Sequence, residues 1–296
     1  MNLLIDGSSL IHRAHWVNSN HPMKMGEVFI FLRSLKSYIK MFESKSIYVC
    51  WDKKIIKSAT NFRHEISDTE YKGNRDKSKA KDVYSNEESL TTILNCLGVK
   101  NMYPRIMEAD DIIAWLSTTL DGPNIIVTAD KDMLQLVSEK TSFYNPSKKV
   151  LIDPSNFEKE VGVKKDAFLF YKAINGDQSD NIPGWPGYGK VKSKAAAEQI
   201  ADDYASIKQY DVELKLIFER NLRLMNLEQG YNKAGPEEIK AYQEQFDTLI
   251  DLEPDLDKFR FYCEKFEFKQ FLKKFNEWEN IFKGSRLLSV LNNMFS

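Results

Sequence analysis

The stretch Leu3-Leu4-Ile5-Asp6-Gly7-Ser8 contains the pattern that decides the fold of this chain. Its three apolar residues predict a short buried strand, and a carboxylate follows directly at the end of that strand. The same order of an apolar run and an aspartate recurs twice, in Ile47-Tyr48-Val49 with Asp52 and in Ile125-Ile126-Val127 with Asp130. Such strands alternate with helix-like stretches over residues 1 to about 180, which predicts an α/β fold with a mainly parallel central sheet and helices on both faces.

The periodicity of apolar residues predicts where the individual elements lie. Strands are expected at residues 2–6, 46–51, 99–103, 124–128 and 142–145. Helices are expected at residues 26–43, 86–97, 109–120, 131–138 and 164–174. A Gly/Pro cluster follows Asn175, and helix-like sequence continues to the end. We therefore expect a core at residues 1–180 and a second, helical region at 181–296.

Nine carboxylates gather in five short blocks at or near the predicted strand ends. They are Asp6, Asp52, Glu108, Asp110, Asp111, Asp130, Asp132, Asp177 and Asp180. Helix capping explains each block by itself. However, strand ends of a parallel sheet converge on one crevice, and so many like charges repel each other unless a cation lies among them. Oxygen ligands without nearby His or Cys favour Mg²⁺ or Mn²⁺.

A basic segment interrupts the alternation of strands and helices at about residues 53–85. From Lys53 to Lys81 it carries nine Lys/Arg and four acids, and it is longer than an ordinary connection. If its Tyr71-Lys72-Gly73-Asn74-Arg75 stretch is helical, Lys72 and Arg75 share one face. Gly73 would weaken such a helix by about 1 kcal/mol relative to Ala. The segment is either a solvated loop or a surface that faces phosphates.

A glycine-rich loop, Gly184-Trp185-Pro186-Gly187-Tyr188-Gly189-Lys190, follows the last acidic block. It has the spacing of a nucleotide-binding P-loop, but Val191 stands where Ser or Thr would hold Mg²⁺ and no predicted strand precedes it, so we reject an ATPase. Its backbone N–H groups can approach a phosphate closely. No acid lies between Gly184 and Ala197, so we expect the loop to bind a nucleic-acid backbone.

The bulk composition is that of a globular protein without a membrane segment. The net charge is −1, the three cysteines are scattered, and no apolar run approaches the roughly 18 residues that a membrane span needs. The first residues form a predicted strand instead of a signal peptide. Unpaired cysteines are typical of a reducing compartment, so we expect a cytoplasmic protein.

Taken in order, these blocks resemble the 5′-nuclease family: bacteriophage 5′→3′ exonucleases, the 5′-nuclease domain of bacterial DNA polymerase I, and flap endonucleases. The resemblance covers residues 4 to about 195. The matching segments are Leu4-Ile5-Asp6-Gly7, Trp51-Asp52, Tyr71-Lys72-Gly73-Asn74-Arg75, Glu108-Ala109-Asp110-Asp111, Thr128-Ala129-Asp130-Lys131-Asp132, Gly176-Asp177-Gln178-Ser179-Asp180-Asn181 and Pro183-Gly184-Trp185-Pro186-Gly187-Tyr188-Gly189. Tyr71 to Arg75 make the phage-type enzymes the nearest likeness.

The resemblance implies a PIN-like 5′-nuclease core, a basic helical arch at about 53–85, and a helix–turn–helix DNA-binding element in the C-terminal region. It implies one tight metal site formed by Asp6, Asp52, Glu108, Asp110 and Asp111. It implies that Asp130, Asp132, Asp177 and Asp180 complete this site and build a second one. The resemblance implies catalytic roles for Lys72, Arg75, Asp130 and Asp132. Contacts to nucleic acid fall to Arg13, Tyr71, Lys72, Arg75, Lys172, Gly187, Gly189, Lys190 and Lys192, with Tyr71 stacking on a base. The family usually places Lys two residues after the last hairpin glycine, where this chain has Val191, so Lys190 or Lys192 would substitute.

The implied activity is Mg²⁺-dependent cleavage of DNA with a 5′ flap or 5′ overhang, or of an RNA–DNA hybrid, by a monomer that removes RNA primers or flaps in replication. Two or more Mg²⁺, replaceable by Mn²⁺, and a monovalent cation at the hairpin are implied. A bacteriophage source would place the protein in host cytoplasm. A sliding clamp could bind the tail Leu287–Ser296, although an ordinary amphipathic terminus explains these residues better, and a single-strand binding protein could be a further partner. The alternatives are a PIN-like ribonuclease and a non-catalytic protein that binds DNA junctions.

Overall fold

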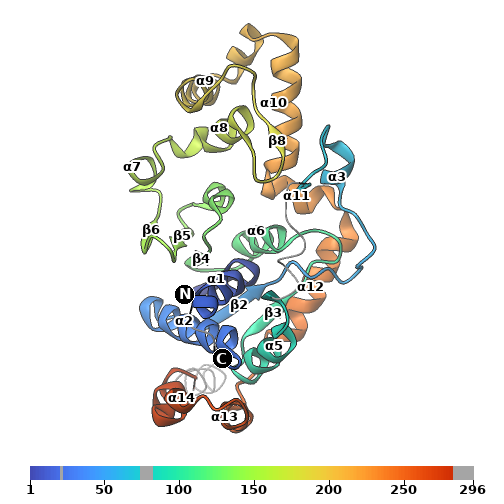
Figure 1. Cartoon of the computed structure of the whole chain (residues 1–296). Helices are drawn as coiled ribbons and strands as arrows, with labels where there is room; N and C mark the ends of the chain where they lie inside the picture. The colour runs from blue at the N-terminus through green and yellow to red at the C-terminus, as the bar shows by residue number, and fades with distance from the viewer. Residues whose placement is uncertain (21–22, 74–82, 283–296) are drawn as a thin grey trace, which may run out of the picture.

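The computed structural model describes residues 1–20, 23–73 and 83–282. A six-stranded sheet runs through the molecule in the order β3-β2-β1-β4-β5-β6 (Figure 1). Its strands are β1 (Asn2–Asp6), β2 (Ser46–Cys50), β3 (Lys100–Met102), β4 (Asn124–Val127), β5 (Thr141–Asn145) and β6 (Val150–Ile152). All neighbouring pairs are parallel except β5 and β6, which are antiparallel. The predicted mainly parallel sheet is confirmed.

Strand β1 lies near the centre of the sheet because its apolar residues can be buried on both faces. Leu3, Leu4 and Ile5 are each fully buried, as expected for a strand covered on both sides. In the register, Asp6 pairs with Cys50 and Ile5 pairs with Val127. The residues that follow the three strands therefore emerge at the same edge of the sheet.

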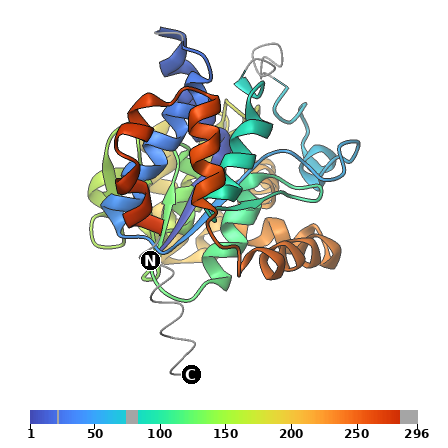
Figure 2. The same cartoon turned by 90° about the horizontal axis from the view of Figure 1, so that it is seen from below.

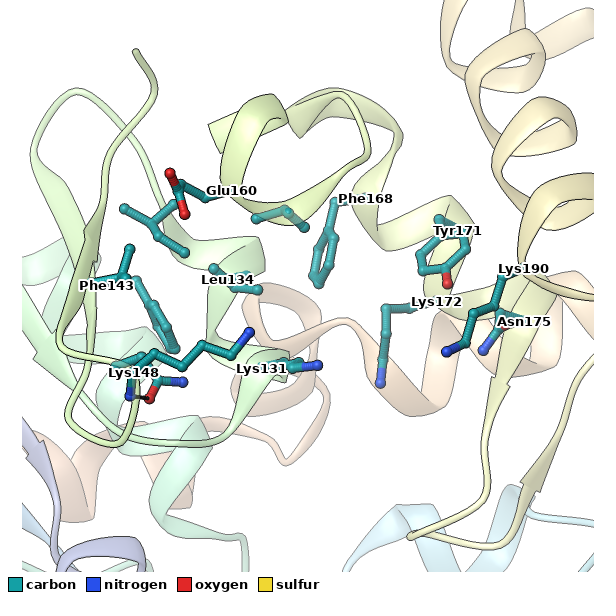
Figure 3. Close-up of a pocket in the computed structure, with 14 residues that line it drawn as sticks. Lys131, Leu134, Phe143, Lys148, Glu160, Phe168, Tyr171, Lys172, Asn175 and Lys190 are labelled. Atoms are coloured by element: carbon teal, nitrogen blue, oxygen red, sulfur yellow. Dashed lines mark hydrogen bonds between the residues drawn. The ribbon is translucent and has the colours of Figure 1, made fainter. Parts of the chain in front are cut away.

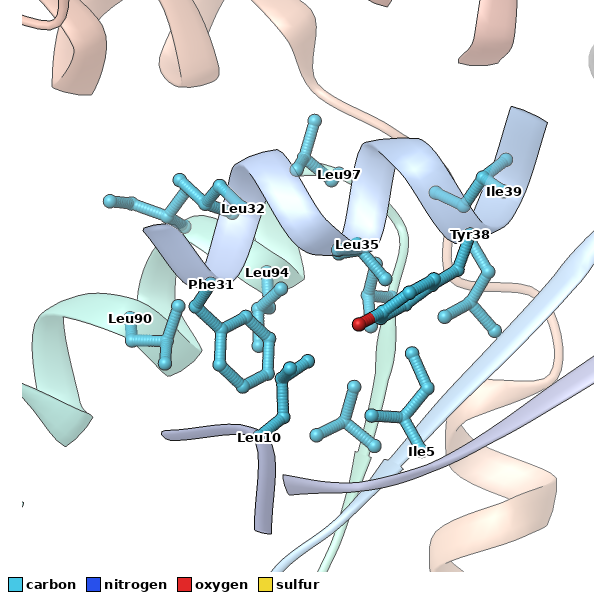
Figure 4. Close-up of a cluster of buried hydrophobic side chains, with 14 of the residues drawn as sticks. Ile5, Leu10, Phe31, Leu32, Leu35, Tyr38, Ile39, Leu90, Leu94 and Leu97 are labelled. Atoms are coloured by element: carbon cyan, nitrogen blue, oxygen red, sulfur yellow. The ribbon is translucent and has the colours of Figure 1, made fainter. Parts of the chain in front are cut away.

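Helices cover both faces of the sheet, as the alternating pattern predicted. On one face lie α1 (Gly7–Asn20), α2 (Gly26–Phe42) and α5 (Glu87–Cys96). Leu3 and Ile5 point to this side, and Ile5 lies below Leu35 and Tyr38 of α2 (Figure 4). The opposite face carries α6 (Ala109–Thr119), α11 (Leu227–Lys233) and α12 (Pro236–Leu249), which enclose Leu4.

A smaller helical unit stands at one end of the molecule, beyond the carboxyl edge of the sheet (Figure 1). It consists of α8 (Phe168–Asn175), α9 (Lys190–Asp202) and α10 (Val212–Met225), packed around Trp185 and Phe218. The hairpin of β7 (Gly176–Asp177) and β8 (Ile182–Pro183) connects α8 to the glycine loop. The last helices, α13 (Leu256–Lys265) and α14 (Lys269–Lys273), lie beside the N-terminal helices (Figure 2).

Three local predictions were incomplete or wrong. Residues 7–20 form a helix that was not expected, and β6 was missed. Residues 131–136 form the 3₁₀ helix η1 (Lys131–Leu136) in place of an α-helix. Lys72 lies in a turn with φ of 58°. Arg75 itself and the tail Leu287–Ser296 fall outside the described residues.

The remaining described elements are short. They are α3 (Phe62–Ile66), α7 (Phe157–Val161), η2 (Lys165–Ala167) and η3 (Tyr204–Gln209). Helix α3 lies in the basic insertion and is capped by Asn61, whose side chain accepts a hydrogen bond from the backbone N–H of Arg63. Among the described helices, none combines the length and apolar character that would let it cross a membrane.

Candidate active site

Asp6 and Asp52 occupy the ends of two adjacent strands and are held by backbone groups. Asp6 is 6% exposed and accepts hydrogen bonds from the N–H of Ser9 at 2.8 Å and the hydroxyl of Thr128 at 2.7 Å. Asp52 accepts from the N–H of Ala109 at 3.0 Å. Both carboxylates therefore sit at positive helix N-termini, Asp6 at α1 and Asp52 at α6.

Burial and neighbouring carboxylates raise the pKa values of two acids at this edge of the sheet. Burial, then the charge of Asp52, raises the pKa of Asp6 from 3.8 to about 7, with Asp130 adding to the effect. Burial also raises the pKa of Asp110 well above its ordinary value, followed by the charges of Asp130, Asp6 and Asp52. Four acids thus destabilise one another when all are charged. A cation among them would relieve that repulsion.

Arg63 is a site residue that the sequence did not single out. Its guanidinium is 1% exposed and donates to both oxygens of Asp111, at 2.8 and 2.7 Å. Its Nε atom donates to the carbonyl of Leu224 at 3.0 Å. Arg63 therefore ties the basic insertion to α6 and α10. Within the basic segment it looked like any other cation, because its partner lies 48 residues away.

Asp111 consequently faces a different partner from the other acids. It is 0% exposed, and both of its oxygens bind Arg63. One oxygen also accepts from the N–H of Glu108 at 3.2 Å, which closes the first turn of α6. The structure gives Asp111 a supporting place behind the acids. Its membership of the tight metal site remains a prediction.

The base of the insertion is fixed to Glu108. The ammonium of Lys72 lies 2.7 Å from one Glu108 oxygen, and the hydroxyl of Tyr71 donates to the other at 3.2 Å. The N–H of Lys72 donates to the carbonyl of Asp180 at 3.0 Å. Tyr71 is 6% exposed and its ring meets His64 edge-on, so this conformation does not present the ring for base stacking.

A second group of acids surrounds Lys172 of α8. The Lys172 ammonium lies 2.7 Å from Asp132 and 2.6 Å from Asp177. Burial raises the pKa of Asp132 to about 6 even though Lys172 opposes this. Burial would likewise raise the pKa of Asp177, but Lys172 and Ser179 bring it below its usual value. Lys172 therefore acts as a counter-ion for this part of the site, which Asp130 borders at the start of η1.

Among the described residues, no three acidic, His or Cys side chains are already arranged to hold a metal ion. The contacts above explain this, because Lys72, Lys172, Arg63 and backbone N–H groups satisfy many of the carboxylate oxygens. The donor set nevertheless fits a hard cation: it is made of oxygen, and burial followed by the charges of neighbouring carboxylates raises the pKa values of Asp6 and Asp110, which a bound cation would lower again.

The glycine loop exposes backbone beside the start of α9. A Cβ on Gly187 or Gly189 would meet no atom within 4 Å, so a ligand can approach both residues. Gly184 differs, because a Cβ there would lie 2.4 Å from the carbonyl oxygen of Asn175. Lys190 and Lys192 are exposed at the first turn of α9, and Arg13 of α1 donates to the hydroxyl of Tyr38 at 3.3 Å.

Comparison with known proteins identifies the family. The family described as 5′-3′ exonuclease, N-terminal resolvase-like domain, matches residues 1–162. The chain belongs to the 5′-3′ exonuclease family. It is 33% identical over 195 residues to a 5′-3′ exonuclease of Buchnera aphidicola subsp. Schizaphis graminum, covering 63% of this chain and 66% of that protein. It is 27% identical over 284 residues to the 5′-3′ exonuclease of Buchnera aphidicola subsp. Acyrthosiphon pisum, covering 93% of this chain and 96% of that one.

The thermostable DNA polymerase I of Thermus aquaticus is 28% identical over 286 residues, which cover 94% of this exonuclease-family chain and 33% of the polymerase. The chain thus spans just under two thirds of the exonuclease first named and one third of the polymerase. A solved structure of the bacteriophage T5 D15 flap endonuclease has a TM-score of 0.70 at 20% identity, covering 85% of this chain and 100% of that one. This likeness confirms the fold.

Proposed function

We propose that this protein is a divalent-metal-dependent 5′-nuclease that hydrolyses phosphodiester bonds where a 5′ single strand meets duplex DNA. The observation that carries the proposal is the meeting of Asp6, Asp52, Asp110 and Asp130 at one edge of the sheet, where burial and the neighbouring carboxylates raise the pKa values of Asp6 and Asp110. The T5 D15 flap endonuclease was solved with DNA and metal ions, which supports the same chemistry here.

Asp6, Asp52, Glu108 and Asp110 would hold one metal ion, and Asp130, Asp132, Asp177 and Asp180 would hold or share a second. Mg²⁺, or Mn²⁺ in its place, suits an all-oxygen set. When bound, two such ions supply a hydroxide nucleophile and stabilise the charge on the attacking and leaving oxygens. Asp111 was expected as a fifth member of the first site; we propose instead that it orients this set from behind, because both of its oxygens bind Arg63 and one also accepts from the N–H of Glu108.

The lysines of the site stabilise the negative charge of the substrate. Lys72 and Lys172 each lie within 2.7 Å of an acid that belongs to the proposed metal set. Cation binding at those acids would leave the ammonium groups available to the phosphate under attack, where negative charge builds up in the transition state. Arg75 would add a further positive charge from the insertion.

The glycine loop and α9 would hold the duplex without reading its sequence. Gly187 and Gly189 leave the backbone accessible, and exposed Lys190 and Lys192 adjoin them. A monovalent cation would fit at the same hairpin. The substrates are DNA with a 5′ flap or overhang and RNA–DNA hybrids, and the biological role is the removal of RNA primers or flaps during replication.

Cleavage of a 5′-labelled flap duplex tests the proposal. The expected result is short labelled products in Mg²⁺ and none in EDTA. Asp130→Asn should lower the rate by at least about 100-fold, while the matched control Asp121→Asn, an exposed acid at the opposite end of the sheet, keeps it. Equal rates for both variants would contradict the proposal, as would cleavage of RNA alone.

A further inference from the structure

A cavity of about 440 Å³ lies beside the carboxylates. The β5–β6 hairpin and η1 form one side of it, and α7, α8 and the start of α9 form the other (Figure 3). Lys131 and Lys148 come from the first side, and Lys172 and Lys190 come from the second. All the elements that form this cavity lie within the described residues. The cavity lies between the sheet and α9, which places it along the proposed path of the substrate.

The lining of the cavity is strongly cationic. It contains four lysines and a single acid, Glu160. Lys131, Lys148 and Lys190 are exposed, and in the described part of the chain none of the three forms an ion pair with an acid. Three uncompensated ammonium groups around one hollow repel each other, so an anion that enters between them is bound favourably.

The floor of the cavity is apolar. Leu134, Phe143 and Phe168 line it and are each at least 95% buried. An apolar wall strengthens the attraction between the lysines and an anion, because water screens the charges less there. It also offers contact area for a sugar. A phosphodiester with its attached deoxyribose matches both parts of the lining.

The cavity shares a wall with the proposed metal site. Lys131 stands between Asp130 and Asp132 in the sequence, and Lys172 lines the cavity while its ammonium contacts Asp132 at 2.7 Å. A strand whose scissile phosphate lies at the acids therefore has neighbouring phosphates within reach of the cavity. The cavity is therefore an extension of the proposed active site and differs in this from an isolated basic patch on the surface.

We propose that this cavity binds a backbone phosphate of the nucleic-acid strand next to the cleaved bond, with Lys131 and Lys148 as its principal contacts. The inference rests on the proposed function and adds a phosphate subsite to it. The contact fixes the register of the strand at the metals and does not read its sequence. Lys148 is the best residue to test, because the β5–β6 turn carries it away from the acids.

Binding of a 5′-flap duplex in EDTA, measured at several salt concentrations, tests the cavity without cleavage. Each phosphate contact contributes about 0.9 to the slope of log affinity against log salt. Lys148→Ala should therefore lower the slope by about one and weaken binding several-fold at low salt. Lys140→Ala, an equal charge change on an exposed residue just before β5, should leave the slope unchanged. Equal slopes for the two variants would overturn the inference.

Neutral methylphosphonate linkages placed one at a time in the cleaved strand locate the phosphate. At one position the substitution should weaken wild-type binding and have no effect in Lys148→Ala, as in a double-mutant cycle. Calorimetric titration with inorganic phosphate and with a deoxynucleoside monophosphate covers the other source of this ligand. If Lys148→Ala loses the binding of these small ligands and no methylphosphonate position shows the expected effect, the cavity binds a released product. That result would overturn the assignment of the cavity to a phosphate of the strand.

The two proposals fail in different ways. If the wild-type protein neither binds nor cuts flap DNA, the proposed function is wrong. If it binds and cuts, and Lys148→Ala matches Lys140→Ala in slope and methylphosphonate response, only the cavity inference is wrong.

Discussion

Replacement of Arg63 by Met should remove much of the stability of this protein. Arg63 is 1% exposed and Asp111 is 0% exposed, and the two are joined by bonds of 2.8 and 2.7 Å. Met fills similar volume but leaves the carboxylate buried without a counter-charge. Breaking such a pair costs about 3–5 kcal/mol, a large share of the 5–15 kcal/mol that typically stabilises a protein.

The assay is equilibrium unfolding in urea, followed by tryptophan fluorescence and circular dichroism. Arg63→Lys should lose about half as much free energy of unfolding as Arg63→Met, because one ammonium group cannot bond both carboxylate oxygens as the guanidinium does. The double variant Arg63→Met/Asp111→Leu should recover most of the loss, since neither member is then left charged and buried. Lys233→Met, which removes an exposed cation in the same region, serves as the control.

The double variant should regain stability without regaining full activity. Asp111 closes the first turn of α6 through the N–H of Glu108, so its loss should lower cleavage even where stability returns. A loss below about 1 kcal/mol for Arg63→Met would refute the account of the ion pair. So would a double variant that is less stable than either single one.

Three further predictions concern the acids and the glycine loop. In EDTA, the free energy of unfolding should fall as pH rises from about 4 to 7, by up to about 1.4 kcal/mol per pH unit. The reason is that the pKa of Asp6 is raised from 3.8 to about 7 in the folded state, which therefore holds a proton that the unfolded state has lost. Urea unfolding at pH 5 and 8 checks this, and a rise of stability with pH would contradict it. Mg²⁺ at 100 times its dissociation constant should add about 2.7 kcal/mol of stability at pH 8, measured as a thermal shift that Asp110→Asn abolishes. Gly184→Ala should destabilise by about 1–3 kcal/mol because its Cβ would meet the Asn175 carbonyl, whereas Gly189→Ala should leave stability unchanged and weaken duplex binding; urea unfolding and a binding titration separate the two effects.

The sequence was sufficient to predict the sheet edge that builds the site. Leu3-Leu4-Ile5 before Asp6 and Ile125-Ile126-Val127 before Asp130 are unbroken apolar runs, and such runs become central parallel strands whose ends meet. The acids therefore converge wherever the strands pair. This inference needs no knowledge of side-chain packing, which explains why it succeeded.

Other features depend on contacts that no local pattern contains. The Arg63–Asp111 pair joins residues from the insertion and α6, and Lys172 reaches Asp132 across 40 positions in the chain. Helix α1 was missed because polar residues interrupt its apolar face, although the Asp6 bond to the N–H of Ser9 starts it. Lys72 lies in a turn, where Gly73 follows it and its own backbone adopts positive φ.

The most direct test of the central claim is a Mn²⁺ titration followed by electron paramagnetic resonance, in which bound ions lose the sharp signal of free Mn²⁺. We expect at least one tightly bound ion in the wild-type protein and in Asp121→Asn. Asp110→Asn should lose that ion together with flap cleavage, although it remains folded. Tight binding that is unchanged in Asp110→Asn, or the absence of binding in an active wild-type protein, would contradict the claim that these carboxylates hold the catalytic metal.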